Sequence, residues 1–221
     1  MKLESFKSIF FKALMSGFMI GIGGTVYLMC DNKYMGGFLF SFGLFTIIQL
    51  GFALYTGKVG YIPERKPIYI REVLITLLGN IVGTGVTALL ISATRIGAKV
   101  HENAVAAMDT KMSDGIVSRL ILGFFCGTLM YLAVENGKNC RIKGHDVSMI
   151  FGTAVPVMLF IFCGFNHSIA DCFYYFSAGA TVSGALYILE VAIGNALGGM
   201  FIPFMKKLFD KPEEVQTTPT K

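Results

Sequence analysis

Six long apolar segments follow one another along this chain, and each is near the length that a lipid bilayer requires. A helix needs about 20 predominantly apolar residues to cross the hydrocarbon core of a bilayer. Only 15% of the 221 residues are charged, whereas soluble domains carry about 25%. The sequence therefore predicts an all-α membrane protein, with spans at about 9–30, 36–55, 72–92, 116–134, 147–176 and 178–204.

The basic residues predict how these spans are oriented. Fourteen Lys and Arg residues fall in the N-terminus, the second–third and fourth–fifth connections and the C-terminal tail, and five fall on the other side. Because cytoplasmic loops carry the excess of Lys and Arg, both termini are expected in the cytoplasm. The net charge of +5 comes from these loops, so no nucleic-acid partner is expected. We predict one channel domain over residues 1–207, multi-pass in an inner or plasma membrane, and a disordered cytoplasmic tail over 208–221.

The fifth segment is interrupted by the stretch GFNHSIAD at residues 164–171, which contains the only histidine inside an apolar segment, His167. An ionisable side chain at mid-membrane depth is costly, about 2.5–3.5 kcal/mol on insertion scales for Arg, Lys or Asp. Non-helical backbone survives at that depth only if it is buried in protein or faces a water-filled cavity. The interruption therefore indicates a permeation pathway.

The two halves of the chain repeat one another. A Gly-Phe pair ends the second segment at 51–52 and recurs in the fifth at 164–165, and a GNxxG motif around Asn80 recurs around Asn195. Each half has three spans, so the second half must be inverted relative to the first. Paired broken helices in inverted repeats are typical of transporters and channels. The predicted fold is aquaporin-like, with inverted three-helix repeats at about 9–92 and 116–204 and broken second and fifth helices.

The stretch GFNHSIA at 164–170, the two GNxxG helices and the chain length resemble the formate/nitrite transporter family of pentameric channels for small monovalent anions. The similarity covers residues 5–207, and it includes Lys111 and the loop Leu54-Tyr55-Thr56. The resemblance implies a homopentamer in a lipid bilayer that passes small monovalent anions. It implies no cofactor and no metal.

Four polar residues are the predicted pore and anion-binding groups. His167 can offer a hydrogen bond or a proton to a passing anion, which would then cross the constriction partly or wholly neutralised; a core histidine bonded to backbone is the alternative. Lys111, on the predicted outer side, would draw anions inward, unless it is a plain surface lysine. Thr56 is expected to face His167 across the pore or to cap a helix. Asn166 stands where family members often have Glu, which leaves the preferred anion open.

Two further sets of residues follow from the same resemblance. Hydrophobic slits that gate by dewetting are expected to flank the histidine, although Phe and Leu in membrane helices commonly only pack. Asn80 and Asn195 are expected to support the broken helices by bonding freed backbone groups. Asp171 is expected to cap the short helix after the break, and Glu190 has no predicted role. The slit residues are Phe40, Leu44, Leu54, Tyr55, Met130 and Phe160.

The predicted function is a channel or transporter for small monovalent weak-acid anions, formate first, with proton coupling through His167 left open. A nitrite or hydrosulfide channel of the same family is the first alternative. An aquaporin-like pore for neutral solutes is the second, although the Asn-Pro-Ala turns of aquaporins are absent. An enzyme is not expected, because one buried histidine supplies neither a haem-ligand pair nor a hydrolytic cluster.

Overall fold

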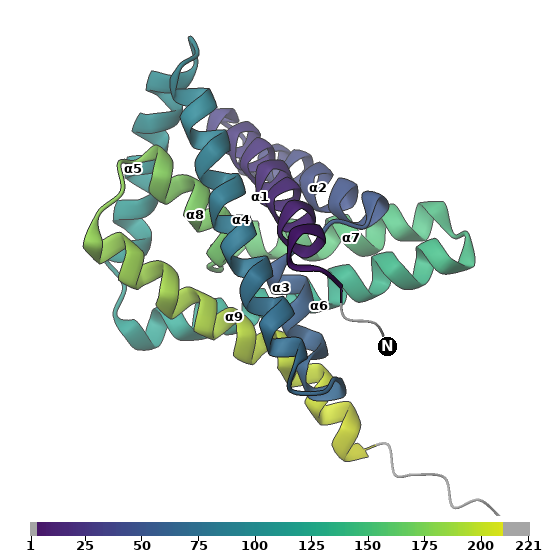
Figure 1. Ribbon diagram of the computed structural model, residues 1–221. Coiled ribbons are helices and arrows are strands. Elements are labelled where there is room, and N and C mark those ends of the chain that lie inside the picture. The colour runs from purple at the N-terminus through teal and green to yellow at the C-terminus, as the bar shows by residue number, and fades with distance from the viewer. Residues whose placement is uncertain (1–3, 210–221) are drawn as a thin grey trace, which may run out of the picture.

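The computed structural model describes residues 4–209, and helices make up the fold of this part of the chain (Figure 1). In chain order the elements are α1 (Phe6–Met29), α2 (Lys33–Leu50), α3 (Tyr55–Lys58), the 3-10 helix η1 (Val59–Glu64), α4 (Tyr69–Ser92), α5 (Gly97–Met112), α6 (Ile116–Lys143), α7 (Asp146–Phe162), α8 (Ser168–Ser177) and α9 (Val182–Phe209).

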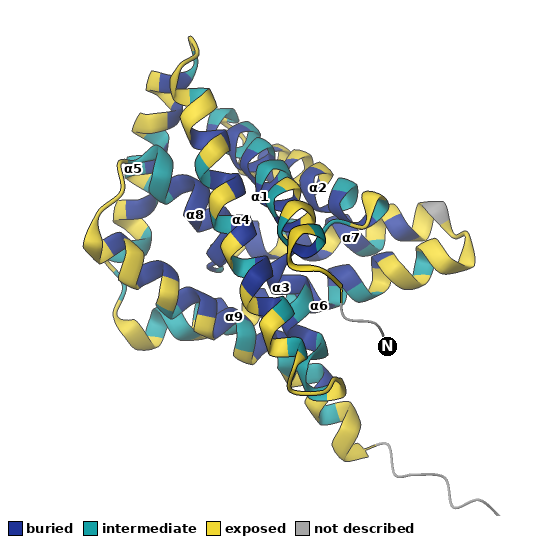
Figure 2. Ribbon diagram, viewed as in Figure 1, coloured by how far each residue is buried: buried dark blue, intermediate teal, exposed yellow. Residues whose placement is uncertain are grey.

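Five helices in the described part are long and apolar enough to cross a membrane, namely α1, α2, α4, α6 and α9. The predicted fifth span is broken near Gly164, as expected, and is divided between α7, of 17 residues, and α8, of 10 residues. The outward faces of the helices are exposed and the inward faces are buried (Figure 2). Many of the exposed residues are large and apolar. The predicted all-α membrane class is confirmed, and the opposite orientation of the two halves stays a prediction.

Three boundaries differ from the sequence prediction. Residues 97–112, which lie in the connection between two predicted spans, form α5. Its buried residues Val100, Ala104 and Met108 recur every four positions, which is typical of a helix with one buried face. Helix α6 continues nine residues past the predicted end of its span, to Lys143, and forms with α7 a hairpin that extends away from the other helices (Figure 1). Helix α9 continues to Phe209, so residues 208–209 of the predicted tail are helical, and residues 210–221 lie outside the described residues.

Both halves of the chain contain a broken helix with the same backbone geometry. Gly51 ends α2 with φ +67° and Gly164 follows α7 with φ +69°, a left-handed conformation that glycine adopts without strain. In each case the next N–H, of Phe52 or Phe165, bonds at 2.9 Å to the carbonyl five residues earlier. The chain then runs extended for a few residues before a short helix starts, α3 in the first half and α8 in the second.

Matched glycines allow two helix pairs to approach closely, α1 with α4 and α6 with α9. A Cβ at Gly83 of α4 would lie 2.1 Å from the carbonyl oxygen of Leu14, and a Cβ at Gly198 of α9 would lie 1.8 Å from that of Phe124. These two glycines close the two GNxxG motifs. At these glycines the backbones of the two helices are in direct contact, and this contact sets the spacing of both pairs. The spacing in turn places Asn80 and Asn195 against the broken helices.

Gly198→Ala is expected to destabilise the protein by about 1–3 kcal/mol, because the added methyl group must push α6 and α9 apart. The measurement is the midpoint of thermal unfolding in detergent. Gly115→Ala is the matched control, since a Cβ there meets nothing within 4 Å. Equal unfolding midpoints for the two variants would contradict the role given to this close approach.

Candidate functional site

His167 caps the N-terminus of α8 and is held by two hydrogen bonds. Its Nδ1 accepts from the backbone N–H of Ala170 at 3.1 Å, and its Nε2 lies 3.2 Å from Thr56 Oγ1. Because an amide N–H only donates, Nδ1 is unprotonated and the neutral ring carries its proton on Nε2. His167, which is 1% exposed, therefore presents an N–H donor toward Thr56 on α3.

The side-chain amide of Asn195 on α9 satisfies three backbone groups around the break before α8. Its Oδ1 accepts from the N–H of Ser168 at 2.8 Å, and its Nδ2 donates to the carbonyls of Asn166 and Gly123, both at 2.8 Å. The N–H of Ser168 and the carbonyl of Asn166 lie at the junction between α7 and α8, where the helical hydrogen bonds are interrupted. The carbonyl of Gly123 belongs to α6. One buried amide thus replaces the hydrogen bonds that the broken helix loses.

Asn80 on α4 makes the corresponding three bonds in the first half. Its Oδ1 accepts from the N–H of Tyr55 at 2.8 Å, and its Nδ2 donates to the carbonyls of Ala53 at 2.9 Å and Ala13 at 2.7 Å. Tyr55 therefore corresponds to Ser168, and Leu54 corresponds to His167. The two short helices start from equivalent supports but with different residues at their caps.

A cavity of about 640 Å³, here the Lys111 cavity, lies beside α8 at the end of α2 where that helix begins. Lys111 Nζ donates to Asn166 Oδ1 at 2.9 Å and lies 3.2 Å from Asp171 Oδ1. Asp171 Oδ2 accepts from the hydroxyl of Tyr187 at 2.8 Å. Lys111 is thus part of a buried polar cluster rather than a free surface lysine. The cavity is lined by residues that include Lys33, Lys111, Phe160, Phe165, Ala170 and Asp171.

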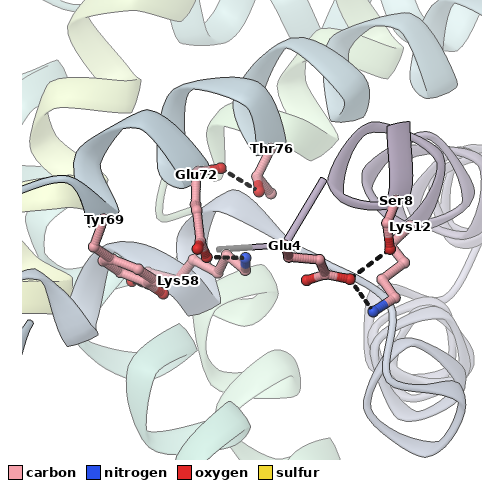
Figure 3. Close-up of polar contacts among 7 residues, drawn as sticks. All are labelled: Glu4, Ser8, Lys12, Lys58, Tyr69, Glu72 and Thr76. Carbon is pink, nitrogen blue, oxygen red and sulfur yellow. Dashed lines mark hydrogen bonds and ion pairs between the residues drawn. The ribbon is translucent and has the colours of Figure 1, made fainter. Parts of the chain in front are cut away.

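A second cavity of about 210 Å³, here the Lys58 cavity, lies at the other end of α2. Lys58 Nζ pairs with Glu72 at 3.4 Å, and Lys12 pairs with Glu4, which also accepts from the Ser8 hydroxyl (Figure 3). The Lys12 ammonium and the Ser8 hydroxyl hold the pKa of the Glu4 carboxyl below its usual range. The lining, which includes Glu4, Lys12, Leu54, Lys58, Lys138 and Arg141, carries more positive than negative side chains.

The His167–Thr56 pair lines neither of these two cavities, and the Phe160 side chain lies between the imidazole and the Lys111 cavity. The Phe160 ring stacks on the imidazole with centroids 5.4 Å apart and meets the edge of Phe40 at 6.0 Å, and Phe160 also lines the Lys111 cavity. Leu54 lines the Lys58 cavity.

The remaining residues predicted to form the slits have less direct placements. Leu44 and Met130 are buried and line neither of the two cavities. Tyr55 also lines neither, and its hydroxyl donates to the carbonyl of Ala192 at 3.0 Å. The structure therefore brings Phe160 to the histidine, Phe40 against Phe160, and Leu54 to a cavity wall.

Two acidic residues differ from the sequence interpretation. Asp171 was expected to cap α8, but the cap is His167, because Asp171 lies in the first turn of the helix and its carboxylate binds Lys111 and Tyr187. Glu190, for which the sequence predicted no role, pairs with Arg119 at 2.8 Å. The partnership of Lys111 with Asp171 was missed, although an acid inside an apolar segment was a signal for it.

The sequence profile of the formate/nitrite transporter family matches residues 1–208. The chain belongs to this family. It is 28% identical over 190 residues to the formate channel FocB of Escherichia coli (strain K12), covering 75% of this chain and 64% of FocB. It is 26% identical over 200 residues to the formate-nitrite transporter of Plasmodium vivax, covering 75% of this chain and 62% of that protein. The chain thus spans just under two thirds of the length of these relatives.

Two solved structures share the fold. A pentameric formate channel with formate bound superposes with a TM-score of 0.74 at 23% identity, covering 92% of this chain and 97% of that one. An FNT family ion channel superposes with a TM-score of 0.79 at 21% identity, covering 93% and 91%. The relatives named here are channels or transporters and not enzymes. With its five long apolar helices, this family member is a multi-pass membrane protein.

Asn195→Ala is expected to destabilise the protein by about 3 kcal/mol, because it leaves the buried N–H of Ser168 and the buried carbonyl of Asn166 without their partner. The measurement is the thermal unfolding midpoint in detergent. The control is Asn139→Ala, since the Asn139 amide bonds only Glu135 at an exposed position. If the Asn195 variant unfolded with the control, the amide would not be what supports α8.

Proposed function

We propose that the protein is a channel for small monovalent weak-acid anions, with formate as its first candidate substrate. The observation that carries the proposal is the position of His167 Nε2–H, a buried N–H donor between two separate cavities that both contain lysine. A neutral imidazole can donate a hydrogen bond to an anion without adding a charge that would trap it. The fold shared with formate channel structures supports this proposal.

In the proposed pathway an anion first reaches Lys111 or, from the opposite end, the lysines of the Lys58 cavity. It then passes one of two hydrophobic slits, formed on one side around Phe40 and Phe160 and on the other around Leu54, with Leu44, Tyr55 and Met130 as further members. Between the slits, the anion takes the place of Thr56 as the acceptor of the His167 Nε2–H hydrogen bond. The Thr56 hydroxyl then donates to a second oxygen of the anion. Asn80 and Asn195 keep both short helices in place while side chains move.

Proton transfer from the ring to the anion is the step that separates symport from simple conduction. It requires the imidazolium form, because a neutral imidazole that gave up its Nε2 proton would be left as an imidazolate, whereas an imidazolium returns to neutral imidazole. A weak acid that takes the proton becomes neutral and crosses the remaining slit with a smaller desolvation cost. The imidazole then recovers a proton from either cavity. Nitrite and hydrosulfide can accept the same bond and are the alternative substrates.

The assembly and orientation are part of the same proposal. The apolar outward faces of the helices suit lipid and neighbouring copies, and a homopentamer is supported by the pentameric formate channel that shares the fold. The distribution of Lys and Arg supports cytoplasmic termini, which would place the Lys58 cavity on the cytoplasmic side of a cell membrane.

In liposomes the wild-type protein is expected to carry formate, and His167→Ala is expected to reduce the flux about tenfold or more, because a donor to a charged group is lost. His167→Asn keeps a capping oxygen and an N–H donor but cannot transfer a proton. It should retain more flux than His167→Ala and lose the pH dependence of transport. The measurement is formate flux and proton uptake at two pH values, with nitrite and hydrosulfide gradients beside formate.

His145→Ala is the control for this series, because His145 is exposed at the start of α7. Its flux should equal that of the wild type. An unchanged rate and an unchanged pH profile in both His167 variants would refute a role for the imidazole in permeation.

Lys111→Ala is expected to raise the formate concentration for half-maximal flux about tenfold, because the cavity loses the charge that attracts anions. The effect should weaken in high salt, where screening reduces the attraction. Lys99→Ala is the matched control on the exposed face of the same helix. Normal half-saturation in the Lys111 variant would remove this residue from the pathway.

A further inference from the structure

Asn166, the residue before His167, has one hydrogen-bonding group that is left unpaired. Its side chain is 1% exposed, and its Nδ2 finds no partner among residues 4–209. The other end of the amide is occupied, because Oδ1 accepts from Lys111 Nζ at 2.9 Å. Turning the amide around would set its NH₂ group against the ammonium, donor against donor. The unpaired group is therefore an N–H donor, and a buried donor without a partner is costly.

Each oxygen atom of the one carboxylate in this cluster already has a partner. Asp171 Oδ1 pairs with Lys111 at 3.2 Å, and Oδ2 accepts from the Tyr187 hydroxyl at 2.8 Å. Lys111 has three N–H donors, of which Asn166 and Asp171 occupy two. What remains available at this point is one N–H of Lys111 and the NH₂ group of Asn166, which has two N–H donors.

The charges of the cluster add to the same conclusion. Lys111 and Asp171 together are neutral, so an arriving anion is not held by excess charge at the cluster itself. Its binding depends on how many donors it can accept from at once. A planar anion with two oxygen atoms can accept from both groups, whereas the single sulfur of hydrosulfide is a weak acceptor.

The cluster also lies on the route toward the histidine. Lys111 and Asp171 line the Lys111 cavity together with Phe165, and Asn166 connects Phe165 to His167 in the chain. Asn166 itself does not line the cavity, so a ligand held by both donors would lie inward of Lys111, next to the segment that leads to His167.

We propose that Lys111 Nζ and Asn166 Nδ2 form a two-donor site that binds the ionised form of a small planar oxyanion, a carboxylate or nitrite, before it reaches His167. Asp171 is the positioning residue of this site, because it holds Lys111 against Asn166 Oδ1 and so keeps Nδ2 free. The site rests on the proposed channel function and narrows its substrate class, since it favours two-oxygen anions over hydrosulfide.

The experiment compares formate, nitrite and hydrosulfide flux in liposomes for three variants of the full chain. Asn166→Leu removes the donor without adding charge, and Asn166→Asp replaces the donor by an acceptor of the same shape. The double variant Asn166→Asp/Asp171→Asn keeps one carboxylate in the cluster but moves it. The site predicts that all three raise the half-saturating concentration of formate and nitrite about tenfold or more while the maximal flux stays near wild type. Hydrosulfide should change less than threefold.

The double variant separates a lost donor from a changed charge. If added charge alone weakened binding in Asn166→Asp, the double variant would recover wild-type half-saturation, and the two-donor site would be wrong. Asn166→Leu answers the question without either acid should Asn166→Asp fail to fold. A fall in maximal flux for every anion with unchanged half-saturation would also overturn the site, because a structural role alone produces it.

Failure of the site and failure of the channel function are distinguishable. If the wild-type protein carries formate and Asn166→Leu carries it with unchanged half-saturation, the site is wrong and the channel function stands. If the wild-type protein carries none of the three anions, both are wrong. Lys99→Ala, on the exposed face of α5, should keep formate half-saturation near wild type.

Discussion

A broken helix inside a membrane must find partners for its backbone groups, and in this protein two side-chain amides supply them. Asn80 and Asn195 each bond one N–H and two carbonyls, and four of these six backbone groups flank the two interruptions. Lipid offers no hydrogen bonds, so without the amides the extended segments could not remain at this depth. Glycines allow α1 to approach α4 and α6 to approach α9 closely, and this approach brings the two amides within hydrogen-bonding distance of the backbone groups.

The geometry of the two interruptions also determines the protonation and the hydrogen-bond partner of the histidine that lies between them. The start of α8 at Ser168 requires a cap, and the cap is the imidazole of His167, which determines the ring nitrogen that carries the proton. The resulting donor faces Thr56 at the start of α3, so the two half-helices meet through a single polar contact. Phe160 separates this contact from the Lys111 cavity, and Leu54 lines the Lys58 cavity on the opposite side. The support of the broken helix, the tautomer of His167 and the position of Phe160 beside the ring therefore follow from one arrangement of the backbone.

The spans and their interruptions could be predicted from the sequence because they depend on local sequence patterns. Apolar length predicts the spans, and the repeated Gly-Phe and GNxxG motifs predict both interruptions and the asparagines beside them. The partners of Asp171 could not be predicted, since Tyr187 and Lys111 reach it from other helices and no spacing rule relates them. The assignment of the cap to Asp171 failed because short acids usually cap helices, and here a histidine one turn earlier takes that place. Helix α5 was missed because its apolar residues are few and its length is below that of a span.

The equivalence of Leu54 and His167 has a consequence for the symmetry of the molecule. Two nearly identical scaffolds deliver two half-helices to the centre, but α3 begins at Leu54 without any side-chain cap, whereas α8 begins at a titratable ring. A second proton on that ring would remove the acceptor for Ala170 and loosen the first turn of α8, while α3 has no comparable group to respond. A duplicated architecture has thus become chemically one-sided, because a titratable group caps only one of its two half-helices.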